Sequence, residues 1–429
     1  MTPSATANWF VAVELHVRSG PGRPDLSFGP ILEAPGPAQL RRARRRGLRT
    51  AVLARSRTFY GPELDDLVDV WIECDTRDSD RLSSAVTALP GVIAALTSSV
   101  DSFVGPAAAA ARTMGLRGPT PRTPALSRDK AVARAALAAA GVPDVAWAVV
   151  PANDPRLDSP IGYPCVVKPV DGAASWDVRL VENRAQTRAL AAQHLQRLEY
   201  GRGVRPQHRL LFEQYVPGPL ISAEGFVHDG VPQVLAWSDR LLTAPPHFAE
   251  LAITSIATPP TPAADGFVRD TLAALQYDFG AFHLEFILGS HGPRLVELNP
   301  RLIGAGAHVC VDHAAGVDSA DHVVARLLGE TPSEPHPTAE AAASTQMYLT
   351  AETSGRVHAV GDVRKLSELP GVVSAEVSTD VGRLVRPATS SSDYLGHVLT
   401  VGATPAQARE RALAAKFAVR IDLEETARA

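Results

Sequence analysis

Residues 282–302 of the chain read FHLEFILGSHGPRLVELNPRL. Two largely apolar runs flank the stretch GSHG at 289–292, and glycine, serine and proline clustered between such runs indicate a β-hairpin. A turn centred on His291 places Glu285 opposite Glu297. Because side chains alternate along a strand, both glutamates then point to one face of the hairpin. The sequence therefore predicts a pair of directly opposed carboxylates in an apolar hairpin.

Opposed carboxylates are unfavourable unless a cation lies between them. Directly paired residues of antiparallel strands have Cβ atoms about 4.5–5.5 Å apart, and like charges at that distance destabilise the pair. The oxygen ligands of Glu285, Glu297 and the Asn299 amide suit Mg²⁺ or Mn²⁺, and Mg²⁺ usually accompanies phosphate. Arg301 follows at the end of the second strand, where it would clamp a phosphate or an acyl phosphate. The competing interpretation is an edge hairpin whose two glutamates point into solvent.

The spacing E-x(11)-E-x-N-x-R, with its last part written ELNPR, resembles the metal-binding hairpin of the ATP-grasp superfamily. The resemblance implies that Glu285, Glu297 and Asn299 hold the magnesium ions on ATP. It also implies that Arg301 meets the reacting phosphoryl and acyl groups. The implied fold class is α/β and α+β: an ATP-grasp fold with a parallel α/β domain before it and a small closing domain after it.

The composition of the chain excludes several classes of function. Its 429 residues are 45% hydrophobic with a formal net charge of −4, which allows two to four domains and gives no electrostatic argument for nucleic acid or membrane. No apolar run reaches the length of a transmembrane helix, and the N-terminus lacks the pattern of a signal peptide. Three widely spaced cysteines form no zinc or disulfide pattern. We therefore expect a cytoplasmic protein.

Strand and helix patterns alternate over residues 1–120. The run NWFVAVELHV at 8–17 reads as a strand, and PAQLRRARRRG at 37–47 reads as a helix. The alternation indicates a small parallel α/β domain. No aromatic residues accompany the arginines of 37–47, so we interpret them as a solvated helix face rather than a nucleic-acid patch. The glycines of SGPGRP at 19–24 indicate a plain loop rather than a phosphate loop.

Two lysines are candidates for contacts to nucleotide phosphates. Ser127 is the predicted N-cap of the helix SRDKAVARAALAAAG. This role explains Ser127 better than the S-x-x-K motif of serine acylases does. The ATP-grasp resemblance places Lys130, at the start of this helix, on the phosphates. Lys168 lies in the buried-strand pattern CVVKP, where a lysine is unfavourable unless an anion pairs with it. The alternative for Lys168 is a surface hairpin with a snorkelling side chain.

The turn after CVVKP corresponds in the family to the lid over the triphosphate, here residues 171–177. The resemblance implies these nucleotide contacts: Asp171, Gly172, Ala173 and Ser175. The family commonly has DGSGSRGV at this place, whereas this chain reads DGAASWDV. Two glycines and a basic residue are lost, and Asp177 is expected to repel phosphate. These departures predict that the backbone of the loop adapts less freely to a bound phosphate.

The strand LLFEQYV at 210–216 resembles the hinge that grips adenine. The resemblance places Glu213 at the exocyclic amine, and the backbone of Tyr215 and Val216 at the ring edge. Leu220 replaces the acid that often binds the ribose hydroxyls, seven residues beyond the hinge glutamate.

The next strands carry Glu224 and Arg240, which we expect to face the nucleotide and the reacting groups. Further on, Ala252–Ile253 replaces the Gly-His that commonly follows E-L in the amino-acid ligases. The replacement predicts that this chain recognises its substrate differently. His308, Asp312 and His313 fit no standard metal spacing, and we interpret them as a helix with scattered polar residues.

The resemblance implies four parts: an N-terminal domain at 1–120, ATP-grasp subdomain A at 121–205, subdomain B with the metal hairpin at 206–335, and a C-terminal domain at 336–429. It implies an ATP-dependent carboxylate–amine ligase that works through an acyl phosphate on small-molecule substrates, amino acids above all, with ATP and Mg²⁺ or Mn²⁺. Family members often form homodimers. The alternatives are a biotin-carboxylase-like or purine-pathway enzyme on the same fold, and a non-catalytic nucleotide-binding protein.

Overall fold

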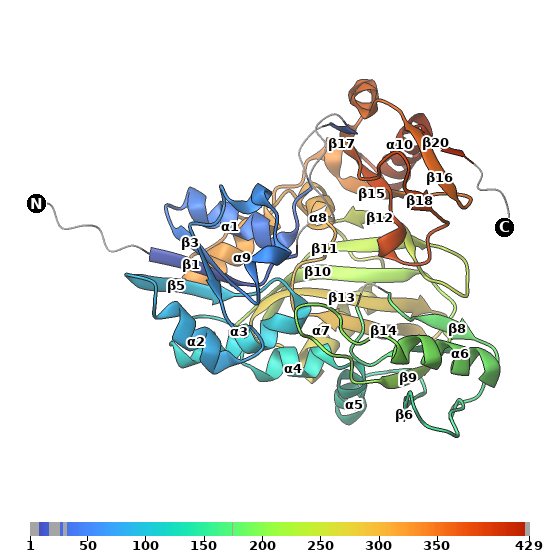
Figure 1. The fold of residues 1–429 in the computed structure, drawn as a ribbon, viewed down its shortest axis with the longest axis horizontal. Helices are drawn as coiled ribbons and strands as arrows, with labels where there is room; N and C mark the ends of the chain where they lie inside the picture. Colours follow the sequence, from blue (N-terminus) through green and yellow to red (C-terminus); the bar gives the residue numbers. More distant parts are fainter. Residues whose placement is uncertain (1–7, 17–25, 29–31, 174, 425–429) are drawn as a thin grey trace, which may run out of the picture.

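The structure is a computed structural model that describes residues 8–16, 26–28, 32–173 and 175–424. Within these residues the strands form four sheets, one parallel and three antiparallel. Figure 1 shows the N-terminal elements in blue beside the long central strands, with the C-terminal elements in orange and red above and the green β6–β9 region below. The predicted SGPGRP loop lies outside the described residues.

The N-terminal sheet is parallel, with strand order β4-β3-β1-β5. Its central strand is almost fully buried, and Trp9, Phe10 and Val11 have no exposed surface, as expected when helices cover both faces of a parallel sheet. The predicted parallel α/β arrangement is confirmed. Its elements are β1 (Asn8–Val13), α1 (Pro35–Arg45), β3 (Arg49–Ala54), η2 (Arg57–Phe59), η3 (Pro62–Leu64), β4 (Val70–Glu73), α2 (Ser79–Val86), β5 (Val92–Thr97) and α3 (Asp101–Thr113).

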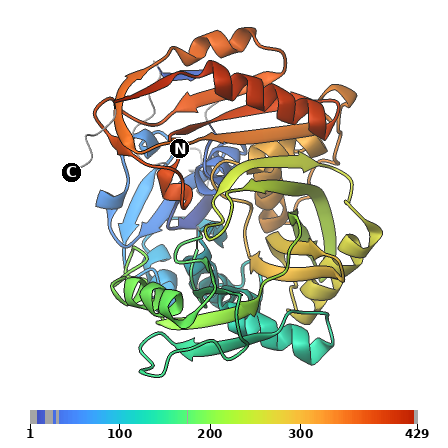
Figure 2. The ribbon, with the colours of Figure 1, turned by 90° about the vertical axis from the view of Figure 1, so that its right-hand side faces the viewer.

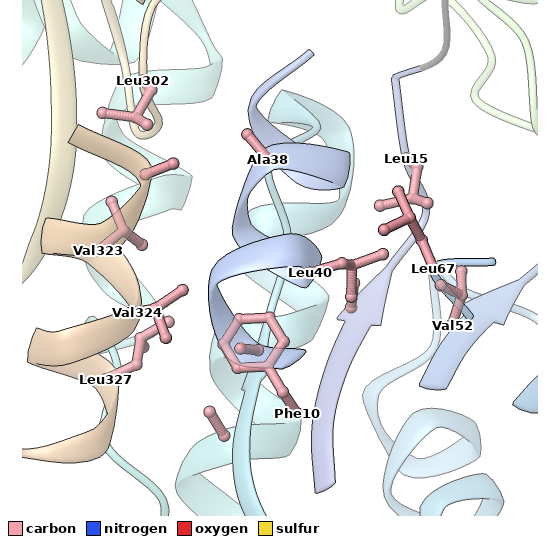
Figure 3. Packing of buried hydrophobic residues seen from close by; sticks show 14 of the residues in the cluster. Phe10, Leu15, Ala38, Leu40, Val52, Leu67, Leu302, Val323, Val324 and Leu327 are labelled. Carbon is pink, nitrogen blue, oxygen red and sulfur yellow. The ribbon is translucent and has the colours of Figure 1, made fainter. Parts of the chain in front are cut away.

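The arginine-rich helix α1 packs against α9 (Ser319–Leu328), far along the chain, over an apolar cluster that Figure 3 shows. Arg42 Nε lies 2.9 Å from Asp318 Oδ2, at the start of α9. Arg46 pairs with Asp321 and, at 2.9 Å, with Glu330. The interpretation of a solvated helix face is therefore wrong for these two arginines, which join the N-terminal domain to the ATP-grasp region.

A four-stranded antiparallel sheet, β6-β9-β7-β8, forms the second unit. Asp129, not Ser127, caps the helix that begins at Lys130, because its Oδ1 accepts from the N–H of Ala131 at 2.9 Å. Ser127 lies in a separate short helix and donates to the Thr123 carbonyl at 3.1 Å. The elements are α4 (Arg122–Arg128), α5 (Lys130–Ala140), β6 (Trp147–Pro151), β7 (Cys165–Pro169), β8 (Arg179–Val181), α6 (Arg184–Leu195) and β9 (Arg209–Gln214).

A nine-stranded sheet, β14-β13-β10-β11-β12-β15-β19-β17-β2, runs through the rest of the molecule. Figure 2 shows its central strands curving beneath the C-terminal elements. The C-terminal strands extend this sheet through β15, which pairs with β12, so the predicted closing domain is built onto the ATP-grasp sheet. The first elements are β2 (Ser27–Phe28), β10 (Leu220–His228), β11 (Val231–Leu242), β12 (Glu250–Ile256), α7 (Pro262–Ala274), β13 (Gly280–Gly289), β14 (Gly292–Asn299) and α8 (His308–Ala315).

The last stretch, the predicted C-terminal domain at 336–429, consists of short strands followed by a helix and a final strand. The small sheet β18-β16-β20 lies beside α10. No helix in the described part of the chain is long and apolar enough to cross a membrane. The elements are η4 (Ala339–Ala341), β15 (Ala343–Leu349), β16 (Gly355–Val360), η5 (Val363–Glu368), β17 (Val372–Val377), β18 (Leu384–Val385), η6 (Ser391–Asp393), β19 (Gly396–Gly402), α10 (Pro405–Ala418) and β20 (Ile421–Glu424).

Candidate active site

The β13–β14 hairpin pairs Glu285 with Glu297, as predicted. The turn is centred between Ser290 and His291, not on His291, since Gly289 pairs with Gly292. This centre by itself would place Glu285 opposite Val296, one residue out of the expected register. A bulge at Val296 restores the pairing, because the strand partners shift between Glu285 and Phe286.

The two carboxylates are satisfied by different partners. Glu297 lies 2.9 Å from Lys130 Nζ and accepts from Asn299 Nδ2 at 2.8 Å. Burial raises the pKa of Glu297, but the charge of Lys130 and the Asn299 hydrogen bond outweigh it and hold the pKa below its usual value. Glu285 lies 2.8 Å from His283 Nε2. The expectation of solvent-facing glutamates is thereby excluded, since both side chains are mostly covered.

His283 bridges two carboxylates. Its Nδ1 lies 2.9 Å from Glu224, and its Nε2 contacts Glu285. Burial lowers the pKa of His283, but Glu224 and Glu285 outweigh burial and raise it to about 9. A protonated imidazole therefore donates to both acids near neutral pH, and the predicted ligand-contact residue Glu224 holds it in place.

Arg240 extends from β11 toward the same hairpin and is buried. Its Nε pairs with Glu250, and its Nη1 donates to Ser222 Oγ at 2.7 Å. Its Nη2 lies 3.7 Å from Glu285 and has no hydrogen-bond acceptor among the described residues. A buried guanidinium nitrogen without an acceptor is unfavourable, so this atom marks a place for an anionic ligand group.

Lys168 is buried on β7, as the sequence predicted, and its anion is Glu213 of the neighbouring strand at 2.8 Å. Burial lowers the pKa of Lys168, and Glu213 opposes that effect. Arg134 binds the other oxygen of Glu213, at 2.7 Å, and also pairs with Asp144. Sequence reasoning missed Arg134, although its spacing of four residues from Lys130 puts both on one face of α5.

The hinge residues Tyr215 and Val216 follow directly after β9. Tyr215 lies near Phe248, with ring centroids 6.5 Å apart. Both oxygens of Glu213 already accept from the two cations described above, so in this structure Glu213 orients Lys168. Adenine contacts by these three residues stay a prediction.

The lid residues 171–177 are anchored at both ends. Asp171 accepts from Tyr200 Oη at 3.2 Å and from the Gln207 N–H at 3.0 Å. Asp177 is buried and contacts three side chains that follow it in the chain: Gln193 at 2.8 Å, His194 at 3.1 Å and Arg197 at 3.3 Å.

The expectation that Asp177 repels phosphate is therefore wrong, because its carboxylate is turned into α6. Its φ of 56° is the left-handed conformation that the usual glycine adopts without strain. The Gly172 carbonyl accepts from Lys130 Nζ at 2.8 Å, which connects the lid to the hairpin through the same lysine. Ala173 and Ser175 lie between the two anchors.

Arg301 forms a two-point ion pair with Asp101 of the N-terminal domain, at 2.9 and 3.0 Å. No feature of the sequence analysis singled out Asp101. The one available signal was its place directly after a strand at the crevice edge of a parallel sheet, where ligand sites commonly lie.

Cavities and acidic clusters do not identify the site by themselves. A cavity of about 330 Å³ lies in the C-terminal region, between Ser354 and Leu395, away from every predicted site residue. A smaller one, of about 40 Å³, includes Arg301 in its lining. Among the described residues no group of three or more His, Cys, Asp or Glu side chains is arranged to hold a metal. The residues 308–313 lie in α8, as interpreted from the sequence.

Two family models match the chain: an ATP-grasp domain at residues 161–311 and an L-amino acid ligase C-terminal domain 2 at residues 347–424. The chain therefore contains an ATP-grasp domain. Members of this ligase superfamily use ATP and a divalent metal.

Relatives of this ATP-grasp protein include the uncharacterized protein y4rH of Sinorhizobium fredii, 29% identical over 384 residues, which are 85% of this chain and 76% of that protein. Carnosine synthase 1 of Gallus gallus is 36% identical over 154 residues, which are 34% of this chain but only 16% of that protein. The fold is similar to an L-amino acid ligase from Bacillus licheniformis, with a TM-score of 0.73 and 18% identity over 98% of this chain and 100% of that one.

The residues present fit a divalent ion on a nucleotide. The opposed carboxylates of Glu285 and Glu297 and the amide of Asn299 are oxygen donors, which Mg²⁺ prefers, and so few protein ligands leave most positions for phosphate and water. Lys130 now pairs with Glu297 and would be freed toward phosphate when a metal takes the carboxylate. This ATP-grasp hairpin therefore has the donor set that the sequence predicted.

Proposed function

We propose that this ATP-grasp protein is a carboxylate–amine ligase that forms an amide and releases ADP and phosphate. The observation that supports it is the pair of opposed carboxylates with Lys130, Lys168, Arg240 and Arg301 gathered around it. An L-amino acid ligase C-terminal domain in the same chain favours amino acids as substrates.

In this proposal each charged side chain has one task. Lys130 and Lys168 bind the nucleotide phosphates, and a divalent ion on Glu285, Glu297 and Asn299 would neutralise phosphate charge. Arg301 binds the transferred phosphoryl group and Arg240 binds the substrate carboxylate, which attacks the γ-phosphorus and gives an acyl phosphate and ADP. The amine then attacks the acyl carbon, and phosphate leaves.

The remaining predicted contacts concern the nucleotide. The backbone of Tyr215 and Val216 holds the adenine edge, while Glu213 and Glu224 act through Lys168 and His283. Lid residues 171–177 cover the phosphates and exclude water, which otherwise hydrolyses the acyl phosphate.

The surroundings of Arg240 favour a substrate that has a polar group besides its carboxylate. Among the described residues, Glu250 and Glu224 pair with Arg240 and His283, and Nη2 of Arg240 has no hydrogen-bond acceptor. Tyr348 is buried close to Glu250, and its hydroxyl has no hydrogen-bond partner among the described residues. An amino acid would supply a carboxylate for Arg240 and an ammonium group as the polar partner of Tyr348.

The test is the release of ADP and phosphate from Mg-ATP across a panel of single and paired amino acids, with mass spectrometry of the products. A product whose mass is the sum of one pair less water supports the proposal. Release that requires bicarbonate instead would support the carboxylase alternative. No release with any pair would contradict the ligase assignment. Light scattering on the same sample checks the expected homodimer.

A further inference from the structure

Arg301 is held by a residue of a different domain. It lies two residues beyond β14, and its buried side chain reaches α3 of the N-terminal domain. Its Nε lies 2.9 Å from Asp101 Oδ1, and its Nη2 donates to Asp101 Oδ2 at 3.0 Å. One hydrogen bond and a second close charge contact to the same carboxylate restrict the position of the guanidinium.

The pair leaves a defined part of Arg301 for a ligand. Nη1 donates to the Leu302 carbonyl at 2.8 Å, so two of the five guanidinium N–H groups form hydrogen bonds with the described residues. Leu302 itself is packed in the cluster that joins α9 to the N-terminal domain (Figure 3). The three remaining N–H groups are therefore presented by a group that is held on both sides.

Asp101 also keeps Arg301 from the metal hairpin. Arg301 is close enough to Glu297 and Glu285 for their charges to raise its pKa, although burial opposes them and Asp101 contributes most. Glu285 and Glu297 are the two carboxylates that the divalent ion would need, and Asp101 gives Arg301 a separate counter-charge from the N-terminal domain.

We infer that Asp101 is a positioning residue for the reaction, which aligns Arg301 toward the transferred phosphoryl group and keeps it off Glu285 and Glu297. This inference rests on the proposed function for the identity of the reaction. It also gives the N-terminal domain a direct part in the site, through the first residue of α3.

The experiment compares Asp101→Asn with Asp318→Asn, which alters another ion pair between the N-terminal domain and the ATP-grasp region. Asparagine keeps the cap that Asp318 provides to α9, so only the charge toward Arg42 is lost. We expect Asp101→Asn to lower kcat about 10- to 100-fold with little change in the KM for ATP, since misplacement of a reacting group has effects of that size. Asp318→Asn is expected to leave kcat unchanged.

Two further measurements separate positioning from folding. Combined with Arg301→Lys, Asp101→Asn should add almost nothing to the loss, because both changes disable one guanidinium. The inference would be overturned if the losses in kcat of the two single variants multiply in the double variant, or if kcat is unchanged in Asp101→Asn. If Asp101→Asn is unfolded by circular dichroism, Asp101→Glu keeps the charge but displaces the guanidinium, and it should lower kcat in a folded protein.

Binding of inorganic phosphate to the MgADP-loaded protein, measured by calorimetry, needs no knowledge of the substrates. Phosphate should bind more weakly to Asp101→Asn and Arg301→Lys than to the unmodified protein and Asp318→Asn. If no amino acid pair is ligated but this difference holds, the proposed function fails while the positioning role stands. Equal phosphate affinity in all four proteins would overturn the positioning role.

Discussion

The β13–β14 hairpin and the lid loop, which we propose to serve one phosphate site, differ in what they share with the ATP-grasp pattern. In the hairpin, the residue types are those of the ATP-grasp pattern, from Glu285 to Arg301. In the lid, two glycines and a basic residue are replaced, yet Asp171 and Asp177 anchor the loop at both ends. Side-chain charge cannot be replaced in the hairpin, whereas a loop that binds through its backbone needs only its shape.

The largest effect is expected from Glu297→Gln in the hairpin. The change keeps the shape but removes the charge that a divalent ion and Lys130 require, so we expect turnover to fall by about 10³-fold, as for loss of a major charge-stabilising group. ADP release reports it. Glu182→Gln, an exposed glutamate after β8, is the control. Turnover within tenfold of the unmodified protein would show that the opposed carboxylates do not hold the metal.

Lys168→Met is expected to have the next largest effect. Methionine fills the buried space but removes a charge-assisted contact to phosphate, which predicts a fall in ATP affinity of about 10- to 100-fold. Calorimetry with Mg-ATP measures it, and Lys416→Met, a half-buried lysine of α10, serves as control. An unchanged ATP affinity would mean that Lys168 only balances Glu213.

Asp177→Gly restores the residue that the family commonly has in the lid. It should free the loop from α6, so hydrogen exchange over residues 171–177 becomes faster while ATP affinity changes less than about fivefold, because backbone contacts remain. Slower exchange, or loss of ATP binding, would contradict the anchoring role.

The stabilisation that Asp177 provides depends on pH. Burial raises the pKa of Asp177, but His194 and Arg197 outweigh burial and lower it below its usual value. The folded-state pKa is therefore depressed, and the stabilisation is present above about pH 4 and lost as the pH falls through the folded-state value. Asp177→Gly should reduce this acid sensitivity.

Trp176→Ala should have the smallest effect. Trp176 stacks on Tyr200, with Arg197 4.7 Å above its ring, and its indole N–H reaches Ser392 at 3.4 Å. Removing an exposed cation–π contact predicts a loss of about 0.5–1 kcal/mol in the free energy of unfolding. Urea denaturation measures it. A large loss of turnover would show that this residue, which replaces a basic one, contacts the nucleotide.

The sequence predicted the hairpin well because its signals are local. Alternation and turn residues gave the pairing of Glu285 with Glu297, although two errors cancelled: the turn is centred half a residue before His291, and a bulge at Val296 compensates. Helix starts were less certain. Ser127 and Asp129 are both good caps, and the choice of Asp129 depends on a distant contact, the bond from the Lys130 N–H to the Val170 carbonyl.

The partners of the charged residues could not be predicted from the sequence. Glu213, the anion of Lys168, lies 45 residues from it in the chain. Asp101, the anion of Arg301, lies 200 residues from it. Such pairs arise from the docking of whole elements, which residue patterns do not encode. The direction of Asp177 was misjudged for the same reason, since three side chains from α6 onward decide it.

The nine-stranded sheet limits how such a protein can be divided or recombined. The ligase-type C-terminal domain begins, by its family model, at residue 347, which lies inside β15. A cut at that place would leave residues 343–346 on β12 without their other neighbour, β19, and the open edge of such a short strand promotes aggregation. Exchange of C-terminal parts between related enzymes therefore has to keep all of β15, with its pairing to β12, as part of the recipient.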